Sequence, residues 1–133
     1  MKKDILVIDD QKSTRFLLLS VLGGDFNVVT APDHHSAFYM LSKKKLPDLI
    51  IVSTQQTDMA DWELIEHFIT HRSYKDIPLL VLSNYSKIET TKRCLQMGIQ
   101  EYFLKPFNPL DLLNTVQRMM DTPAFYALKR TAG

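Results

Sequence analysis

Residues capable of metal and phosphate chemistry stand directly after apolar runs at four places in the chain: the acidic pair Asp9-Asp10, Ser53, Ser83 with Asn84, and Lys105 before Pro106. If each run is a strand of a parallel sheet, these side chains meet, because ligands of such sheets bind beyond the carboxyl ends of the strands. Adjacent carboxylates suit Mg²⁺, which proteins hold through one or two carboxylates together with phosphate oxygens and water. A hydroxyl and an ammonium beside such an ion would hold other oxygens of a phosphoryl group. The pattern predicts a site for Mg²⁺ and phosphate at one edge of a sheet.

Each of these residues also has a purely structural interpretation. Asp9 and Asp10 could cap the helix that follows them. Ser83 could cap a helix or occupy a turn, and Lys105-Pro106 could mark the end of a strand. We favour the site because the topology is expected to bring all of these residues to the same edge.

The elements that must position these residues alternate between two periodicities. Short runs rich in β-branched residues predict strands, and apolar positions at helical spacing between them predict helices. The expected strands are Ile5–Ile8, Phe26–Thr30, Leu49–Ser53, Ile77–Leu82 and Gln100–Leu104. The expected helices are Gln11–Leu22, Asp33–Lys45, about Ala60–Arg72, Lys87–Met97 and one that Asn108 caps and Pro109 opens.

This alternation predicts the fold class. Five strand–helix units joined by short loops indicate an α/β protein, a doubly wound (βα)5 parallel sheet with helices on both faces. Leu49–Ser53 is apolar almost throughout, as in strands that are buried on both sides. The mixed runs Phe26–Thr30 and Gln100–Leu104 should lie nearer the edges of the sheet.

The composition indicates one soluble globular domain. The chain has 133 residues, of which 45% are hydrophobic and 23% charged, and its formal net charge is +1. Near-neutrality argues against binding to nucleic acid or membranes through overall charge. The first apolar run is too short for a signal-peptide core or a membrane span. The single cysteine, Cys94, is expected to fill space on a helix and suits a reducing compartment, so we expect a cytoplasmic protein.

From about residue 3 to residue 120 the chain resembles the receiver domains of two-component response regulators. The motifs that carry the resemblance are ILVIDD, PDLIIVS, IPLLVLSN and MGIQEYFLKPF. The resemblance implies a flavodoxin-like fold with strand order 2-1-3-4-5. Residues 121–133 are then a C-terminal tail or linker, which could extend the last helix, lead to another domain or fray.

The resemblance also implies roles for individual residues. Asp9 and Asp10 correspond to the two acids that bind Mg²⁺ in the family. Ser83 and Lys105 correspond to the residues that contact the phosphoryl group, and Pro106 to a proline that follows this lysine in a cis peptide bond.

Ser53 departs from the family at the position of the aspartate that accepts phosphate from a histidine kinase. A carboxylate is ionised at neutral pH, whereas a serine hydroxyl needs an adjacent base to act as a nucleophile. The loss of one carboxylate also weakens the attraction for Mg²⁺. We expect Lys105 to form an ion pair with Asp10 or Asp9 instead. The sequence therefore predicts a pseudo-receiver that is not phosphorylated on aspartate and holds Mg²⁺ weakly or not at all.

Four other positions bear on switching and on the loop after Ser53. Tyr102 corresponds to an aromatic residue that changes rotamer in the family, although it could equally be a partly buried strand residue. Asn84 stands where the family often has a small residue, so its side chain could partly close the site. Asp58 and Asp61 have the character of residues that start a helix.

Three functions are compatible with these residues. The leading hypothesis is a signalling module, not an enzyme, that contacts a histidine kinase or an effector through the surface of about Lys87–Met120, where a homodimer could also form. In the alternative, a serine/threonine kinase phosphorylates Ser53 or Thr54. The third, an Mg²⁺-dependent phosphotransfer enzyme or hydrolase using Asp9 and Asp10, is disfavoured because it lacks an ionised nucleophile.

Histidines provide the remaining candidate metal ligands. His67 and His71, with Glu63, recur at the i, i+4 spacing of one helix face, and paired histidines at that spacing can bind Zn²⁺. A solvated face is favoured because no further ligand is apparent. His34-His35 is expected to be exposed surface.

Overall fold

A parallel β-sheet forms the middle layer of the computed structural model, which describes residues 1–43, 45–54 and 60–126. Its strands are β1 (Asp4–Ile8), β2 (Asn27–Ala31), β3 (Leu49–Ser53), β4 (Leu79–Ser83) and β5 (Tyr102–Leu104). They pair in the order β2-β1-β3-β4-β5, and every pair is parallel. The predicted order is confirmed, with the two mixed strands at the edges.

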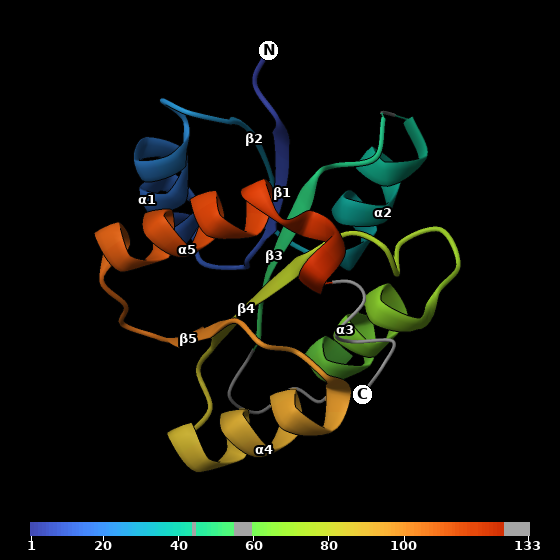
Figure 1. Ribbon diagram of the computed structural model, residues 1–133, viewed down its shortest axis with the longest axis vertical. Helices are drawn as coiled ribbons and strands as arrows, with labels where there is room; N and C mark the ends of the chain where they lie inside the picture. The colour runs from blue at the N-terminus through green and yellow to red at the C-terminus, as the bar shows by residue number, and fades with distance from the viewer. Residues whose placement is uncertain (44, 55–59, 127–133) are drawn as a thin grey trace.

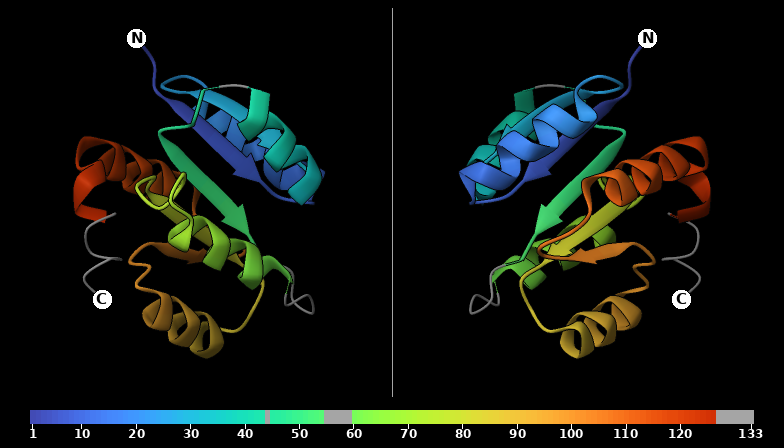
Figure 2. Two further views of the ribbon diagram at one scale, coloured as in Figure 1. Left: turned by 90° about the vertical axis from the view of Figure 1, so that its right-hand side faces the viewer. Right: turned by 90° about the vertical axis from the view of Figure 1, so that its left-hand side faces the viewer.

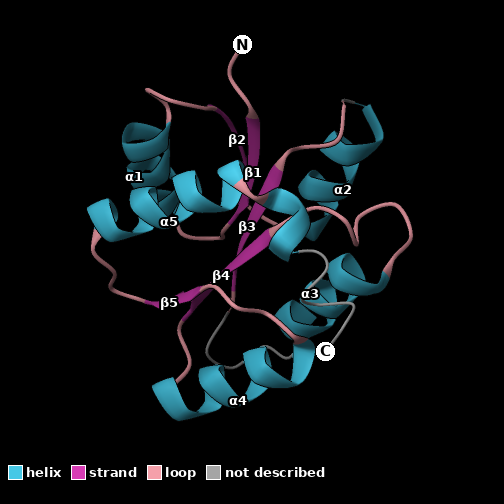
Figure 3. Cartoon of the chain, viewed as in Figure 1, coloured by secondary structure: helices cyan, strands magenta, loops and turns pink. Residues whose placement is uncertain are grey.

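Helices cover both faces of this sheet (Figure 1). They are α1 (Lys12–Leu22), α2 (His34–Lys43), α3 (Ala60–Thr70), α4 (Lys87–Met97) and α5 (Pro109–Asp121). Buried side chains of α1 and α5 pack on one face, and those of α2, α3 and α4 pack on the other. The two side views in Figure 2 show these layers, and Figure 3 shows the alternation of helix and strand along the chain.

The central strands are buried on both sides, as their apolar sequences predict. Every residue of β3 and of β4 is buried, because helices cover both faces of the middle of the sheet. Ile50 and Val52 of β3 contribute to one apolar cluster, and Leu49 and Ile51 contribute to the other. The alternation of side chains along the strand therefore divides its residues between the two cores.

The ends of the helices follow their local capping residues. The side chain of Asn108 accepts hydrogen bonds from the backbone N–H groups of Leu110 and Asp111, as predicted. Ser86 caps α4 at its start, and Gly98 ends that helix with a φ of 71°, a left-handed conformation that favours glycine.

Several predicted element boundaries were wrong by one or two residues. Gln11 is the N-cap of α1 and not its first residue, and α2 ends at Lys43, two residues before the predicted Lys45. The strand predicted to begin at Ile77 begins at Leu79, since Pro78 has no N–H to donate to a strand ladder. β5 begins at Tyr102, and not at Gln100, because the backbone N–H of Ile99 is still bonded to the end of α4.

Helices α2 and α3 also start or stop at residues other than those predicted. α2 begins at His34, because the Asp33 carboxylate accepts the backbone N–H of Ser36 as a cap. α3 ends at Thr70, two residues before the predicted Arg72, and His71 opens a turn.

A short helical turn at residues 123–126 follows α5 and folds back on the core. Tyr126 is 5% exposed and joins the apolar cluster beneath α5. Its hydroxyl accepts a hydrogen bond from Arg118 Nε at 3.4 Å. The chain is therefore packed against the domain as far as Tyr126, five residues beyond the end of α5 at Asp121.

Candidate functional site

The predicted site residues lie at the carboxyl edge of the sheet, where four neighbouring strands end. The ladders pair Ile8 with Val52, Ser53 with Leu82 and Ser83 with Leu104. Asp9, Ser53, Ser83 and Lys105 therefore lie at or just beyond the ends of β1, β3, β4 and β5. The edge predicted from the sequence is the edge where these side chains come together.

The Asp9 carboxylate is the centre of this site, and it is buried with 2% of the residue exposed. Its Oδ2 accepts a short hydrogen bond from Ser53 Oγ and lies 2.7 Å from Lys105 Nζ. Its Oδ1 accepts the backbone N–H of Gln11 at 2.8 Å. The chain's own donors therefore surround both oxygens of the only buried acid at this edge within the described residues.

Lys105 is held firmly in this arrangement. Its side chain is 9% exposed, and its ammonium also donates to Gln11 Oε1 at 3.1 Å. The expected ion pair between Lys105 and one of the two acids is confirmed, and the acid is Asp9. The peptide bond between Lys105 and Pro106 is cis, as the resemblance implies.

The two acids of the pair lie just beyond the end of β1 and have different environments. Asp9 is buried, whereas Asp10 is exposed. Among the described residues, no group of three or more His, Cys, Asp or Glu side chains is arranged to hold a metal ion. The interpretation of Asp9 as a local cap has partial support, since its Oδ1 accepts the N–H of Gln11, the N-cap of α1.

Mg²⁺ does not fit the donors as they stand. This ion needs oxygen ligands in octahedral geometry. The oxygens of Asp9 already accept from Ser53, Lys105 and Gln11, and an ammonium lies where a cation would be attracted.

Ser83 connects the end of β4 to α4. Its Oγ is 2.6 Å from Thr90 Oγ1, and it accepts the backbone N–H of Tyr85 at 3.0 Å. Thr54 Oγ1 also donates to Ser83 Oγ at 3.4 Å. The turn interpretation of Ser83 therefore has a matching hydrogen bond, while the cap of α4 is Ser86.

Thr90 and Thr91 are site residues that sequence reasoning missed. Thr90 binds Ser83, and Thr91 Oγ1 lies 2.8 Å from the hydroxyl of the half-buried Tyr102. Ser83 and Tyr102, which the resemblance matches to a phosphate-contacting and a rotamer-changing residue, are thus each within hydrogen-bond distance of a threonine of α4. Two adjacent hydroxyls on a predicted helix, behind a strand-end serine, are the signal that would have pointed to them.

Asn84 folds over the end of β3. Its Nδ2 donates to the carbonyl of Thr54 at 2.6 Å, and its backbone N–H donates to Thr54 Oγ1 at 3.3 Å. Asn84 and Lys105 also line a surface pocket of about 370 Å³. Asn84 therefore lies where it was expected to limit access.

The other candidates lie away from this edge. The rings of His67 and His71 are 4.8 Å apart and pack with Tyr74 in an aromatic cluster at the end of α3 and the turn that follows it. Burial raises the pKa of the Cys94 thiol to about 12, which makes it an inert core residue as predicted. His35 is exposed. Asp58 and the side chain of Asp61 lie outside the described residues.

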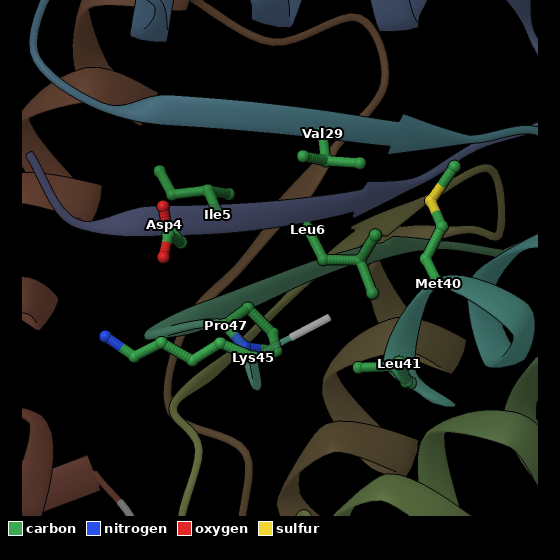
Figure 4. Close-up of a pocket in the computed structure, with 8 residues that line it drawn as sticks. All are labelled: Asp4, Ile5, Leu6, Val29, Met40, Leu41, Lys45 and Pro47. Atoms are coloured by element: carbon green, nitrogen blue, oxygen red, sulfur yellow. The ribbon is translucent and has the colours of Figure 1, made fainter. Parts of the chain in front are cut away.

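A further pocket, of about 240 Å³, lies at the opposite edge of the sheet (Figure 4). Side chains of β1, β2 and α2 line it, among them Leu6, Val29, Met40 and Leu41. Its walls are mostly apolar, and it contains none of the predicted site residues. The candidate site is therefore identified by its polar side chains and not by this pocket.

The fold and the position of these residues at its carboxyl edge define a flavodoxin-like α/β domain. Residues 5–117 match the family model described as the response regulator receiver domain. The chain belongs to this family. Within the described residues, no helix combines the length and apolar character needed to cross a membrane.

Curated relatives include both a short protein and longer regulators. The chain is 30% identical over 115 residues to an uncharacterized 14.6 kDa protein of Leptolyngbya boryana, covering 86% of this chain and 88% of that one. It is also 30% identical over 121 residues to the phosphate regulon transcriptional regulatory protein PhoB of Escherichia coli, covering 90% of this chain and 52% of that protein. The chain therefore spans about half the length of this regulator.

Solved structures of the family superpose closely. A response regulator from Thermotoga maritima matches with a TM-score of 0.79 and 25% identity, over 92% of this chain and 100% of that one. The chemotaxis response regulator CheY4 of Vibrio cholerae matches with a TM-score of 0.75 and 28% identity, over 89% of this chain and 98% of that one.

Proposed function

We propose that this receiver domain is a protein-binding module of a two-component phosphorelay that works without aspartyl phosphorylation. The observation that carries the proposal is the hydrogen bond from Ser53 to Asp9. The side chain at the acceptor position is a buried donor that satisfies a neighbouring acid. It is not an ionised nucleophile facing a phosphate donor.

The surroundings of Ser53 also make it a poor nucleophile. An alcohol needs a base to take its proton. The carboxylate nearest to it, Asp9, already pairs with the Lys105 ammonium. The proposal therefore excludes both the acyl-phosphate chemistry of the family and an Mg²⁺-dependent phosphotransfer enzyme.

Phosphorylation by a serine/threonine kinase is the less favoured alternative. Ser53 is 5% exposed and Thr54 is fully buried. A kinase must hold its target hydroxyl in its own active site, and here the end of β3 would have to leave the sheet first. The burial of both hydroxyls thus favours a protein-binding module over a domain that a serine/threonine kinase phosphorylates.

The surface of α4, β5 and α5 supports contact with a protein partner, either a histidine kinase or an effector. Ile88 and Leu95 on α4 are 83% and 80% exposed, and Leu110 on α5 is 68% exposed. Ile88 and Leu95 are seven residues apart, so they share one face of α4, and exposed apolar side chains on one face are typical of interaction surfaces. The hydrogen bonds of Thr90 and Thr91 to Ser83 and Tyr102 hold α4 in one position, so the surface is available without a phosphate signal.

The proposal also covers the oligomeric state, the kind of partner, the location and the bounds of the domain. A homodimer could use it in place of a second protein. The near-zero net charge gives no reason to expect nucleic acid or membrane as the partner. We place the domain in the cytoplasm, where histidine kinases and their effectors meet, and assign it residues 3–120 with 121–133 as its tail.

One experiment tests the phosphate chemistry. The protein and its Ser53→Asp variant are incubated with MgCl₂ and acetyl phosphate, and the intact mass is measured. We expect no phosphate on the natural protein, and phosphate on the variant alone would identify Ser53 as the change that disables the site. Hydroxylamine-labile phosphate on the natural protein would refute the proposal, whereas acid-stable, hydroxylamine-resistant phosphate on Ser53 or Thr54 would favour the alternative.

A second experiment tests the surface. A photo-crosslinking amino acid is placed at Leu95 and, as a matched control, at Tyr39, which is 65% exposed on α2. We expect one defined adduct from position 95 in cells and none from position 39. Equal capture of the same protein at both positions would contradict the assignment of the surface.

A further inference from the structure

We infer that the Lys105 ammonium is a built-in replacement for the divalent cation at this edge of the sheet. The domain is then closed to Mg²⁺ by its own lysine and not merely by the missing carboxylate at Ser53. This inference deepens the proposed function, on which it rests, because it assigns the switch residue Lys105 a fixed structural partner.

The first argument is geometric. Lys105 Nζ is 2.7 Å from Asp9 Oδ2, the contact that a metal ligand would otherwise offer. The Ser53 hydroxyl shares the same oxygen, and the Gln11 N–H takes the other. A divalent ion would have to displace Lys105 to reach Asp9.

The second argument is electrostatic. The Asp9 side chain is fully buried and that of Lys105 is 9% exposed, so their charges interact with little screening by solvent. The pair is neutral as a unit, whereas a lone buried carboxylate attracts a cation strongly. Asp10 is exposed and adds only a solvated charge nearby. Lys105, more than any other residue, therefore controls whether this edge attracts Mg²⁺.

The third argument concerns the position of Lys105. Its backbone N–H donates to the carbonyl of Ser83 at 2.9 Å, and its ammonium has a second acceptor in Gln11 Oε1. Thr14 Oγ1 donates to the same Gln11 oxygen at 3.2 Å. The lysine is therefore fixed at both ends, and its contact with Asp9 is part of a network.

The test is a gain of metal binding on removal of the lysine. Lys105→Met removes the charge, and Lys105→Gln removes the charge but keeps a donor for Asp9 in case the first variant fails to fold. Lys12→Met, at the exposed start of α1, is the matched control, since it removes a lysine charge near the same edge. Asp9→Asn combined with Lys105→Gln tests whether any new binding uses Asp9.

Mn²⁺ binding is measured by electron paramagnetic resonance on the full chain, and the unfolding temperature is measured with and without MgCl₂. We expect Lys105→Met or Lys105→Gln to bind Mn²⁺ at least about tenfold more tightly than the natural protein. Mg²⁺ should raise the unfolding temperature of these variants and not that of the natural protein or Lys12→Met. Adding Asp9→Asn should abolish the gain.

Two outcomes overturn the inference: Asp9-dependent Mn²⁺ binding by the natural protein that matches the Lys105 variants, or Lys105 variants that bind no more tightly than Lys12→Met. Neither outcome involves phosphate transfer or a partner. The inference and the proposed function can therefore fail separately.

Discussion

Replacing Ser53 with aspartate places a second carboxyl group beside a buried acid that already has its counter-ion. In the natural protein Ser53 donates to Asp9 Oδ2, and Lys105 pairs with the same oxygen. After Ser53→Asp, the donor is lost and one ammonium faces two carboxylates. We predict a clear loss of stability at neutral pH without Mg²⁺.

The magnitude follows from three effects. A hydrogen bond to a charged group contributes about 1.5–3 kcal/mol, and Ser53→Ala should lose roughly this amount. Two like charges about 4 Å apart repel by about 4 kcal/mol at an effective dielectric constant of 20, and the Lys105 ammonium offsets a similar amount. Burial of one more charge then adds several kcal/mol. We expect Ser53→Asp to be at least about 4 kcal/mol less stable than the natural protein.

The deficit should depend on pH with a definite sign. A like charge nearby raises the pKa of the new carboxyl group in the folded state above its unfolded value near 3.9. The native variant then takes up a proton at a pH where the unfolded chain does not. The stability gap to the natural protein should therefore narrow as pH falls from 7 toward 4.

Urea unfolding measures this prediction directly. Trp62 is the only tryptophan and is 2% exposed, so its fluorescence reports loss of the core. With a urea slope of about 2 kcal/mol/M, a deficit of 4 kcal/mol lowers the midpoint by about 2 M. Ser20→Asp, at an exposed position of α1, is the matched control and should change stability by less than about 0.5 kcal/mol. If Ser53→Asp were as stable as Ser20→Asp at pH 7, the buried, charge-paired description of the site would be wrong.

Three further predictions concern positions outside the site. The pKa of the Cys94 thiol is raised from 9.0 to about 12 in the folded protein, so its contribution to stability is present below pH 9 and is lost as pH rises toward 12. Between pH 9 and pH 11, Cys94→Ala should therefore lose less stability than the natural protein does. Identical pH profiles of the two proteins would contradict this prediction. Gly98→Ala should lower the free energy of unfolding by about 1–2 kcal/mol, because Gly98 has a φ of 71°, which strains a residue with a Cβ. An unchanged urea midpoint would contradict this prediction. Asn108→Ala should cost about 1 kcal/mol through loss of the α5 cap, with Asn108→Asp as a control that keeps it.

The fold could be predicted from the sequence because its two periodicities are strong. Runs such as Leu49–Ser53 are long and apolar enough to place central strands, and the mixed runs fell at the edges as expected. The boundaries were less predictable because they depend on single backbone hydrogen bonds. Pro78 makes β4 begin later than predicted, and the N–H of Ile99 remains bonded to the end of α4. Neither feature changes the hydrophobic pattern of the sequence.

For the site, the sequence predicted the residue types but not all of their partners. Ser53, Ser83 and Lys105 reach the expected edge because the strands deliver them there. Which acid pairs with Lys105 depends on the path of the chain beyond β1, which buries Asp9 and exposes Asp10, and the hydrophobic pattern does not predict that path. Thr90 and Thr91 were missed because hydroxyl residues on a helix usually face solvent, and only the packing of α4 brings them to Ser83 and Tyr102.

The buried ion pair of Asp9 and Lys105 fixes the arrangement of its neighbours more than it stabilises the fold. Two apolar residues of similar size in its place are often neutral or stabilising, whereas removing one charge alone is costly. The pair therefore contributes little net stability compared with an apolar core, yet it forces Ser53, Gln11 and the end of β5 into one arrangement. That arrangement adjoins the hydrogen bonds that hold α4. With a serine at the end of β3, the domain thus still has a network that connects the strand ends to its proposed binding surface.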